Sequence, residues 1–197
     1  MAWAFPAPPI AIPPATADPC PDSEVVFARG SGEPAGLGGV GQAFTDALRS
    51  KVPGRSVEVY PVDYPASHDY RISASAGADD ASAHIEAMLA NCPGTKIVLG
   101  GYSQGAGVIG LSTEALPAQA ADHVAAVALF GAPTSTYAGT LWGGPLPQVG
   151  PAYRPKSIDL CIPDDVICAE GGNMVAHLMY VQSGMPDEAA TFAASRL

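Results

Sequence analysis

Positive charge is scarce in this chain of 197 residues, which has nine Lys and Arg residues against nineteen Asp and Glu. Its formal net charge is −10, and only 14% of its residues are charged. Nucleic-acid binding depends on Lys and Arg side chains that neutralise phosphates, so the composition argues against it. It also argues against electrostatic docking on anionic membranes. No stretch of the sequence is long and apolar enough to predict a transmembrane segment.

Cysteine is also rare, but its number is even. The four cysteines, at positions 20, 92, 161 and 168, allow three disulfide pairings. Cys161 and Cys168 bracket a short loop that a disulfide could rigidify, which would leave Cys20 to pair with Cys92. Neither a C-x2-C pair nor a Cys/His quartet occurs, so no metal site is expected. Paired cysteines predict an oxidising compartment, and hence a secreted protein.

The first nineteen residues differ from the rest in being rich in Pro and Ala. Ala15, Thr16 and Ala17 resemble a signal-peptidase site, although prolines interrupt the apolar stretch before them and a basic segment is missing. We interpret residues 1–19 as a signal-peptide remnant or a flexible N-terminal extension. Residues 20–197 show no repeat or shift in composition, and they are predicted to form a single domain.

A G-x-S-x-G motif follows an apolar run in the middle of the chain, at Gly101-Tyr102-Ser103-Gln104-Gly105. Such a motif is typical of a sharp turn from a buried strand to a helix, which presents a serine hydroxyl at the end of a sheet. The glycines leave room for that turn, and the helix after it directs N–H groups towards a developing negative charge. Ser103 is therefore a candidate nucleophile.

The positions of the four histidines relative to Ser103 indicate which of them is the candidate general base. In α/β-hydrolases the catalytic triad runs serine, acid, histidine along the chain, so His68 and His84 come too early. His123 leaves few acids between itself and the serine and is expected to lie at a helix end or on the surface. His177 remains, and the acids that precede it are Asp159, Asp164, Asp165 and Glu170. The short loop between Cys161 and Cys168 holds both Asp164 and Asp165, and spacing does not choose between them.

Strand-like and helical segments alternate along the chain, which predicts a mostly parallel sheet covered by helices. Strands are expected at residues 24–29, 56–61, 96–102, 123–130 and 156–160. Helices are expected at residues 40–51, 76–91, 104–116, 174–180 and 188–195. The Gly- and Pro-rich stretch 133–153 is expected to be a long surface excursion, in which Trp142 either packs in the interior or lines a substrate groove.

Four segments of the chain, in order and in register, resemble the cutinase family of small serine esterases. They are Ala28-Arg-Gly-Ser-Gly-Glu33, Gly100-Gly-Tyr-Ser-Gln-Gly-Ala106, Cys161-x-x-x-Asp165-x-x-Cys168 and His177-Leu-Met-Tyr180. The likeness is greatest to the mycobacterial and actinobacterial members, as judged from the stretch after Tyr64 and the compact C-terminal end. The resemblance implies a small lidless α/β-hydrolase fold, with a five-stranded sheet between two layers of helices.

The resemblance also implies a role for five residues. Ser103 becomes the nucleophile, His177 the general base and Asp165 the acid that orients it. The backbone N–H groups of Ser31 and Gln104 would form the oxyanion hole, to which the Ser31 hydroxyl would add. No metal or organic cofactor is required by such a site.

Substrate residues are expected on two segments, 64–72 and 169–176, which flank the site in the family. Tyr64, Ile167, Met174 and Val175 are the candidates, with ordinary core packing as the alternative for each. The predicted function is that of a secreted, monomeric esterase acting on short to medium acyl esters, on lipids, and on polyesters such as cutin. Two alternatives stay open: a deacetylase of acetylated xylan, and a non-catalytic secreted surface protein.

Overall fold

The computed structural model describes Met1 and residues 20–197. The interpretation of residues 1–19 therefore concerns a segment that, apart from Met1, lies outside the described residues.

A five-stranded parallel sheet forms the centre of the molecule, with the strand order β2-β1-β3-β4-β5. The strands are β1 (Ser23–Ala28), β2 (Val57–Pro61), β3 (Lys96–Tyr102), β4 (Val124–Phe130) and β5 (Ser157–Leu160). The three central strands are apolar at almost every position because helices cover both of their faces. The predicted sheet and its five strands are confirmed, and every strand pair is parallel.

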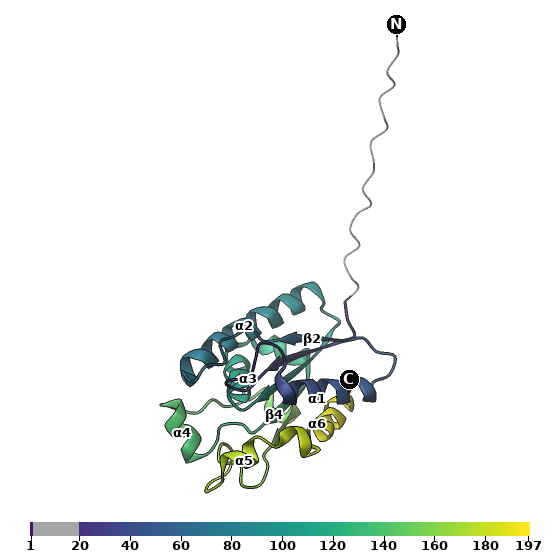
Figure 1. Ribbon diagram of the computed structural model, residues 1–197. Coiled ribbons are helices and arrows are strands. Elements are labelled where there is room, and N and C mark those ends of the chain that lie inside the picture. Colours follow the sequence, from purple (N-terminus) through teal and green to yellow (C-terminus); the bar gives the residue numbers. More distant parts are fainter. Residues whose placement is uncertain (2–19) are drawn as a thin grey trace.

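Helices cover the two faces of this sheet in pairs (Figure 1). On one face lie α1 (Gly38–Lys51) and α6 (Met185–Ala194). Phe44 of α1 packs there against Phe27 of β1 and Phe130 of β4. On the other face lie α2 (Tyr70–Asn91) and α3 (Gln104–Ala115). The shorter helices α4 (Thr136–Trp142) and α5 (Met174–His177) lie beyond the sheet on one side of the molecule (Figure 1).

Helix α4 is the main departure from the expected fold, because residues 133–153 were predicted to be a surface excursion. The hydroxyl of Ser135 accepts a hydrogen bond from the Ala138 N–H and caps the start of α4. Gly143 ends the helix in the left-handed conformation. Trp142, its last residue, is 6% exposed and packs in the core over α3.

Other helix boundaries also differ from those expected, most of all the start of α2. Helix α2 begins at Tyr70, six residues before the expected start. Asp80 lies in the interior of this helix, where its carboxylate accepts hydrogen bonds from the Tyr60 hydroxyl and the Asp63 N–H. The helix expected over residues 174–180 is shorter and ends at His177, and a separate 3₁₀ turn follows at Tyr180–Gln182.

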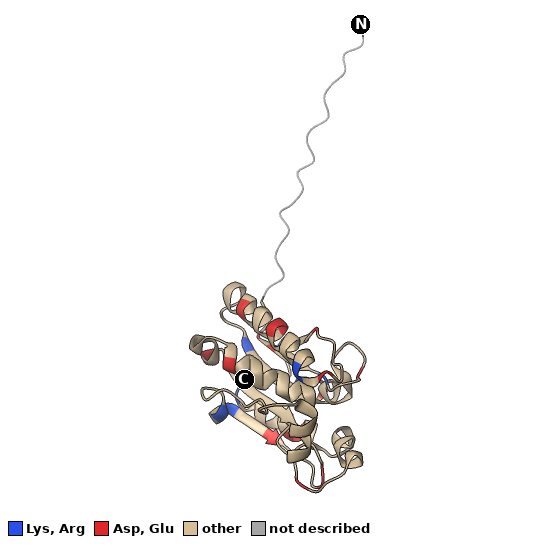
Figure 2. Ribbon diagram, turned by 90° about the vertical axis from the view of Figure 1, so that its left-hand side faces the viewer, with Lys and Arg blue, Asp and Glu red and all other residues tan. Residues whose placement is uncertain are grey.

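Both disulfides are present in the pairing that the sequence favoured. Cys20–Cys92 joins the segment before β1 to the end of α2, and Cys161–Cys168 closes the loop after β5. Within the described residues, none of the helices has the length and apolar character needed to cross a membrane. Lys and Arg positions are few and scattered over separate elements (Figure 2).

Candidate active site

Ser103 stands at a strained turn between β3 and α3. Its φ of 56° and ψ of −119° are rare for a residue with a side chain. The two glycines of the motif are needed for close approach: a Cβ on Gly101 would overlap the backbone of Gly105, and a Cβ on Gly105 would overlap the Ala28 carbonyl. The motif thus fixes the serine at the carboxyl end of β3.

Three side chains from separate elements form a continuous chain of hydrogen bonds. Ser103 Oγ lies 2.8 Å from His177 Nε2, and His177 Nδ1 lies 2.8 Å from Asp165 Oδ2. The serine, histidine and aspartate are 8%, 4% and 0% exposed, so water does not compete for these bonds. The structure also separates the two aspartates that spacing left open, because Asp164 points away into solvent with a φ of 66°.

The Asp165 carboxylate accepts two further hydrogen bonds. The Ile167 N–H donates to Oδ1 at 2.8 Å, and the Tyr180 hydroxyl donates to Oδ2 at 2.7 Å. Burial alone would raise the pKa of Asp165, but the hydrogen bonds from His177, Tyr180 and Ile167 outweigh it and hold the pKa below its ordinary value. The carboxylate is therefore ionised and fixed in orientation.

Two tyrosines hold the site in place, and no role was assigned to them from the sequence. The Tyr180 hydroxyl also accepts the Ile162 N–H, so it links the disulfide loop to Asp165. The Tyr102 ring stacks on His177 at 5.0 Å between centroids, and its hydroxyl donates to the His177 carbonyl. Their positions inside the motifs Gly-Tyr-Ser and His-Leu-Met-Tyr were the available signal.

Removing the Tyr180 hydroxyl tests this network. Because the folded-state pKa of Asp165 is depressed, its ionisation stabilises the fold above the unfolded-state pKa of about 4, and that stabilisation is lost as the pH falls. We expect Tyr180→Phe to lose about 1–3 kcal/mol of unfolding free energy at pH 7. The loss should shrink as the pH falls below about 4 and through the lower pKa of the folded carboxyl, which then becomes protonated. Denaturant unfolding at several pH values measures both.

Tyr153→Phe is the matched control. Tyr153 is 2% exposed, and its buried hydroxyl has no hydrogen-bond partner among the described residues. Its removal takes away a buried polar group without a partner, so stability should stay unchanged or rise, by up to about 1–3 kcal/mol. Equal losses in the two variants, or a Tyr180→Phe loss that does not depend on pH, would contradict the assigned network.

The two residues expected to form an oxyanion hole both lie near Ser103. Gln104 is the first residue of α3, whose N-terminal N–H groups have no partner within the helix. Its side-chain amide donates to the carbonyls of Ser67 and Tyr70, which fixes the segment before α2 against α3. Ser31 lies with Ser103 and His177 in the wall of one recess, although no described contact fixes its hydroxyl.

Two hollows flank the serine. One is an apolar cavity of about 20 Å³, lined by residues of α2, α3, α4 and the disulfide loop: Tyr70, Ser103, Gln104, Pro133, Ala138, Leu141, Trp142 and Ile167. The other is a recess of about 190 Å³ that Ser103 also lines, with Ser31, Glu33, Leu178 and Val181 in its wall.

The four candidate substrate residues separate in the structure. Ile167 lines the apolar cavity beside Ser103. Met174 and Val175 are 41% and 70% exposed on α5, next to His177 but outside that cavity. Tyr64 does not lie on a lip of the cleft: it is 4% exposed, and its hydroxyl donates to the Arg29 carbonyl. The Tyr64 ring packs inward against Gly77 of α2, a contact that sequence spacing does not reveal.

Comparison with known proteins places the chain in a family. The family model of the cutinases matches residues 19–197. "Carboxylesterase Culp1" of Mycobacterium tuberculosis (strain ATCC 25618 / H37Rv) is 64% identical over 184 residues, covering 93% of this chain and 85% of its own. "Phospholipase Culp4" of the same organism is 48% identical over 211 aligned positions, covering 100% and 90%.

Solved structures agree with the sequence comparisons. The Trichoderma reesei cutinase, in complex with a phosphonate inhibitor, has a TM-score of 0.72 and 35% identity, covering 90% of this chain and 77% of its own. The catalytic core domain of the acetyl xylan esterase from Trichoderma reesei shares the fold, with a TM-score of 0.76 and 24% identity over 91% and 100% of the two chains. The resemblance inferred from the four sequence segments is confirmed, and the chain belongs to the cutinase family.

Proposed function

We propose that this protein is a secreted serine esterase that hydrolyses carboxylic esters of short to medium acyl chains, including polyesters. The observation that carries the proposal is the hydrogen-bonded series Ser103–His177–Asp165 at a strained turn. Membership of the cutinase family, with relatives named as a carboxylesterase and a phospholipase, supports ester hydrolysis. The two disulfides support an oxidising, extracellular location.

The proposed reaction proceeds through an acyl-enzyme. His177 Nε2 takes the proton from Ser103 Oγ as the oxygen attacks the ester carbonyl. Asp165 holds the imidazole with Nδ1 protonated and stabilises the positive charge that it acquires. N–H groups of Gln104 and Ser31 stabilise the oxyanion, and His177 returns the proton to the leaving alcohol. Water, activated by the same histidine, then hydrolyses the acyl-enzyme.

The two hollows suggest how an ester is oriented. The apolar cavity beside Ser103 suits the first carbons of an acyl chain. The larger recess, which Ser103 also lines, then receives the alcohol. Glu33 lies in its wall and accepts hydrogen bonds from the N–H groups of Gly30 and Gly39, so its carboxylate disfavours alcohols that carry negative charge. Val175 and Leu178, close to His177 in the sequence, have exposed apolar side chains. They make the surface around the site suitable for contact with lipids and polymers.

A series of p-nitrophenyl esters from acetate to palmitate tests the proposed function. The proposal expects a maximum in kcat/KM between butyrate and octanoate, and activity below the solubility limit of each ester. Activity confined to acetate would favour the deacetylase, for which the shared fold of the acetyl xylan esterase is the only observation. No activity at any length would favour the non-catalytic surface protein.

Acyl length should depend on the width of the apolar cavity. Ala138 of α4 lines it and is 3% exposed, so Ala138→Leu places three more carbons in about 20 Å³. Each CH₂ group of the acyl chain that is no longer buried in the cavity loses about 0.8 kcal/mol of transition-state stabilisation. We expect the ratio of kcat/KM for butyrate over acetate to fall about fourfold, because a cavity of this size has room for about one CH₂ group, which the leucine side chain displaces.

The control for this prediction is on the same helix. Thr140 of α4 is exposed and does not line the cavity, so Thr140→Leu adds a similar apolar side chain outside it. The butyrate-to-acetate ratio should stay within about twofold of the wild type. An unchanged ratio in Ala138→Leu, with the variant folded, would place the acyl chain elsewhere.

A further inference from the structure

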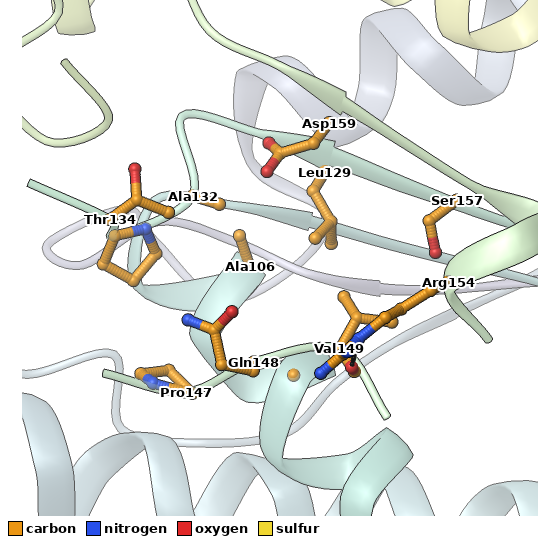
Figure 3. A pocket seen from close by; sticks show the side chains of 12 residues that line it. Ala106, Leu129, Ala132, Thr134, Pro147, Gln148, Val149, Arg154, Ser157 and Asp159 are labelled. Atoms are coloured by element: carbon orange, nitrogen blue, oxygen red, sulfur yellow. Dashed lines mark hydrogen bonds between the residues drawn. The ribbon is translucent and has the colours of Figure 1, made fainter. Parts of the chain in front are cut away.

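A separate recess of about 310 Å³ (Figure 3) shares Pro133 of its wall with the apolar cavity. It is formed where the edge strand β5, the end of β4, the start of α3 and residues 147–149 meet. Its volume is at the lower end of the usual range for ligand pockets, about 300–1,000 Å³. The proposed ester hydrolysis uses none of its polar side chains.

Three polar side chains face this space from different sides (Figure 3). Asp159 reaches it from β5, Gln148 from the loop opposite, and Arg154 from the turn before β5. Arg154 uses Nε to bind the Val149 carbonyl. Within the described residues, Asp159 and Arg154 form no ion pair with each other, so the space between them separates the two charges.

Asp159 was one of the four acidic residues considered as the acid of the triad. In the structure Asp165 bonds to His177, so Asp159 takes no part in the proposed hydrolysis. The walls of the recess remove part of its water, which raises its pKa. Desolvation is the sole cause of the shift, so no described side chain compensates the carboxylate. The side chain nevertheless remains exposed, so the carboxylate is accessible to a ligand that enters the recess from solvent.

The hydrogen-bonding properties of these three side chains indicate which kind of ligand the recess can bind. Ionised Asp159 accepts hydrogen bonds, Arg154 only donates them, and Gln148 does both. A simple cation or anion would satisfy one of the two charges and be repelled by the other. Hydroxyl groups both donate and accept, so a ligand with several of them can satisfy all three side chains. The apolar floor, which includes Leu129 and Pro133, suits the C–H face of the same ligand.

We infer that the recess between Asp159, Gln148 and Arg154 binds a neutral polyhydroxy group, a sugar ring or an acyclic polyol, beside the reactive serine. Pro133 belongs to the walls of both the recess and the apolar cavity, so the bound group would lie next to the substrate site without occupying it. Such a site would hold the protein on a hydroxylated surface that also carries esters. The inference does not require the proposed hydrolysis to be correct.

Amide-detected NMR titration of the ¹⁵N-labelled protein tests the inference directly. The probes are methyl glycosides of glucose, mannose, arabinose and xylose, the polyol xylitol, and phosphoethanolamine as a zwitterion. We expect saturable shifts at Gln148, Ser157 and Asp159 with a glycoside or with xylitol, and the probe that binds distinguishes a cyclic from an acyclic source. The shifts should persist after Ser103 is blocked by a phosphonate, because the recess is separate from the serine.

Asp159→Asn and Arg154→Gln should each weaken this binding about tenfold. Asp46→Asn, which removes a carboxylate from α1 on the other face of the sheet, should leave it unchanged. Asp159→Asn should not lower the melting temperature, since it removes a desolvated charge. Hydrolysis of p-nitrophenyl butyrate should be unaltered in all three variants, which separates this inference from the proposed function.

Binding of phosphoethanolamine alone, or of no probe, would overturn the inference. Equal affinity of the wild type and Asp159→Asn for the bound probe would also overturn it.

Discussion

Ser103→Ala is expected to lower kcat for ester hydrolysis by about 10⁶-fold while leaving the melting temperature within about 2 °C of the wild type. The serine oxygen is the only atom removed, and among the residues that the structure describes His177 Nε2 is its only side-chain partner. Alanine keeps the Cβ, so the strained backbone at φ 56° is neither relieved nor worsened. Turnover of p-nitrophenyl butyrate and thermal unfolding of the same preparation measure the two effects.

Ser103→Gly is the matched control for that result. Glycine adopts a positive φ without steric cost, so this variant should also be inactive but more stable by about 1 kcal/mol. The pair separates loss of the nucleophile from a change in the fold. Residual activity above about 1% in either folded variant would be incompatible with Ser103 as the nucleophile.

Asp165→Asn is expected to lower kcat by about 10⁴-fold. An amide in place of the carboxylate cannot accept hydrogen bonds from Tyr180, His177 and Ile167 together, and it favours the tautomer of His177 that leaves no acceptor for the Ser103 proton. The variant also leaves a buried donor unsatisfied, so part of the effect should appear as lower stability. Steady-state kinetics and unfolding curves are both needed.

Asp164→Asn is its control, one residue away in the same disulfide loop. Asp164 is exposed, and asparagine tolerates its positive φ. Its kcat should stay within about threefold of the wild type. The reverse ranking of the two variants would transfer the acid role to Asp164.

The sheet and its covering helices could be predicted because their signals are local. Runs such as residues 96–102 and 124–130 are apolar at nearly every position, which is typical of strands buried on both faces. The order of serine, acid and histidine likewise needed no coordinates to select His177. Sequence spacing could not show whether Asp164 or Asp165 is the acid that bonds to His177. Neighbouring residues in a tight turn differ in burial, and here Asp164 is exposed whereas Asp165 is buried.

The walls of the substrate site were harder to predict. Helix α4 was missed because residues 133–153 are rich in Gly and Pro, although Ser135 and Gly143 are ordinary capping residues. Without α4, the contribution of Ala138 and Leu141 to the cavity could not be foreseen. Tyr64 was placed on a lip because it lies between two elements, where sequence gives no sign of the inward packing that buries it.

Covalent labelling by an alkyl p-nitrophenyl phosphonate tests the central claim most directly. The reagent forms a P–O bond to an activated serine and releases p-nitrophenolate, so it reports the nucleophile without depending on a particular ester substrate. The account predicts one adduct per chain on the peptide that contains Ser103, no adduct in Ser103→Ala, and much slower labelling in Asp165→Asn. An adduct on another residue, or an unlabelled wild-type protein that is folded and has both disulfides, would contradict it.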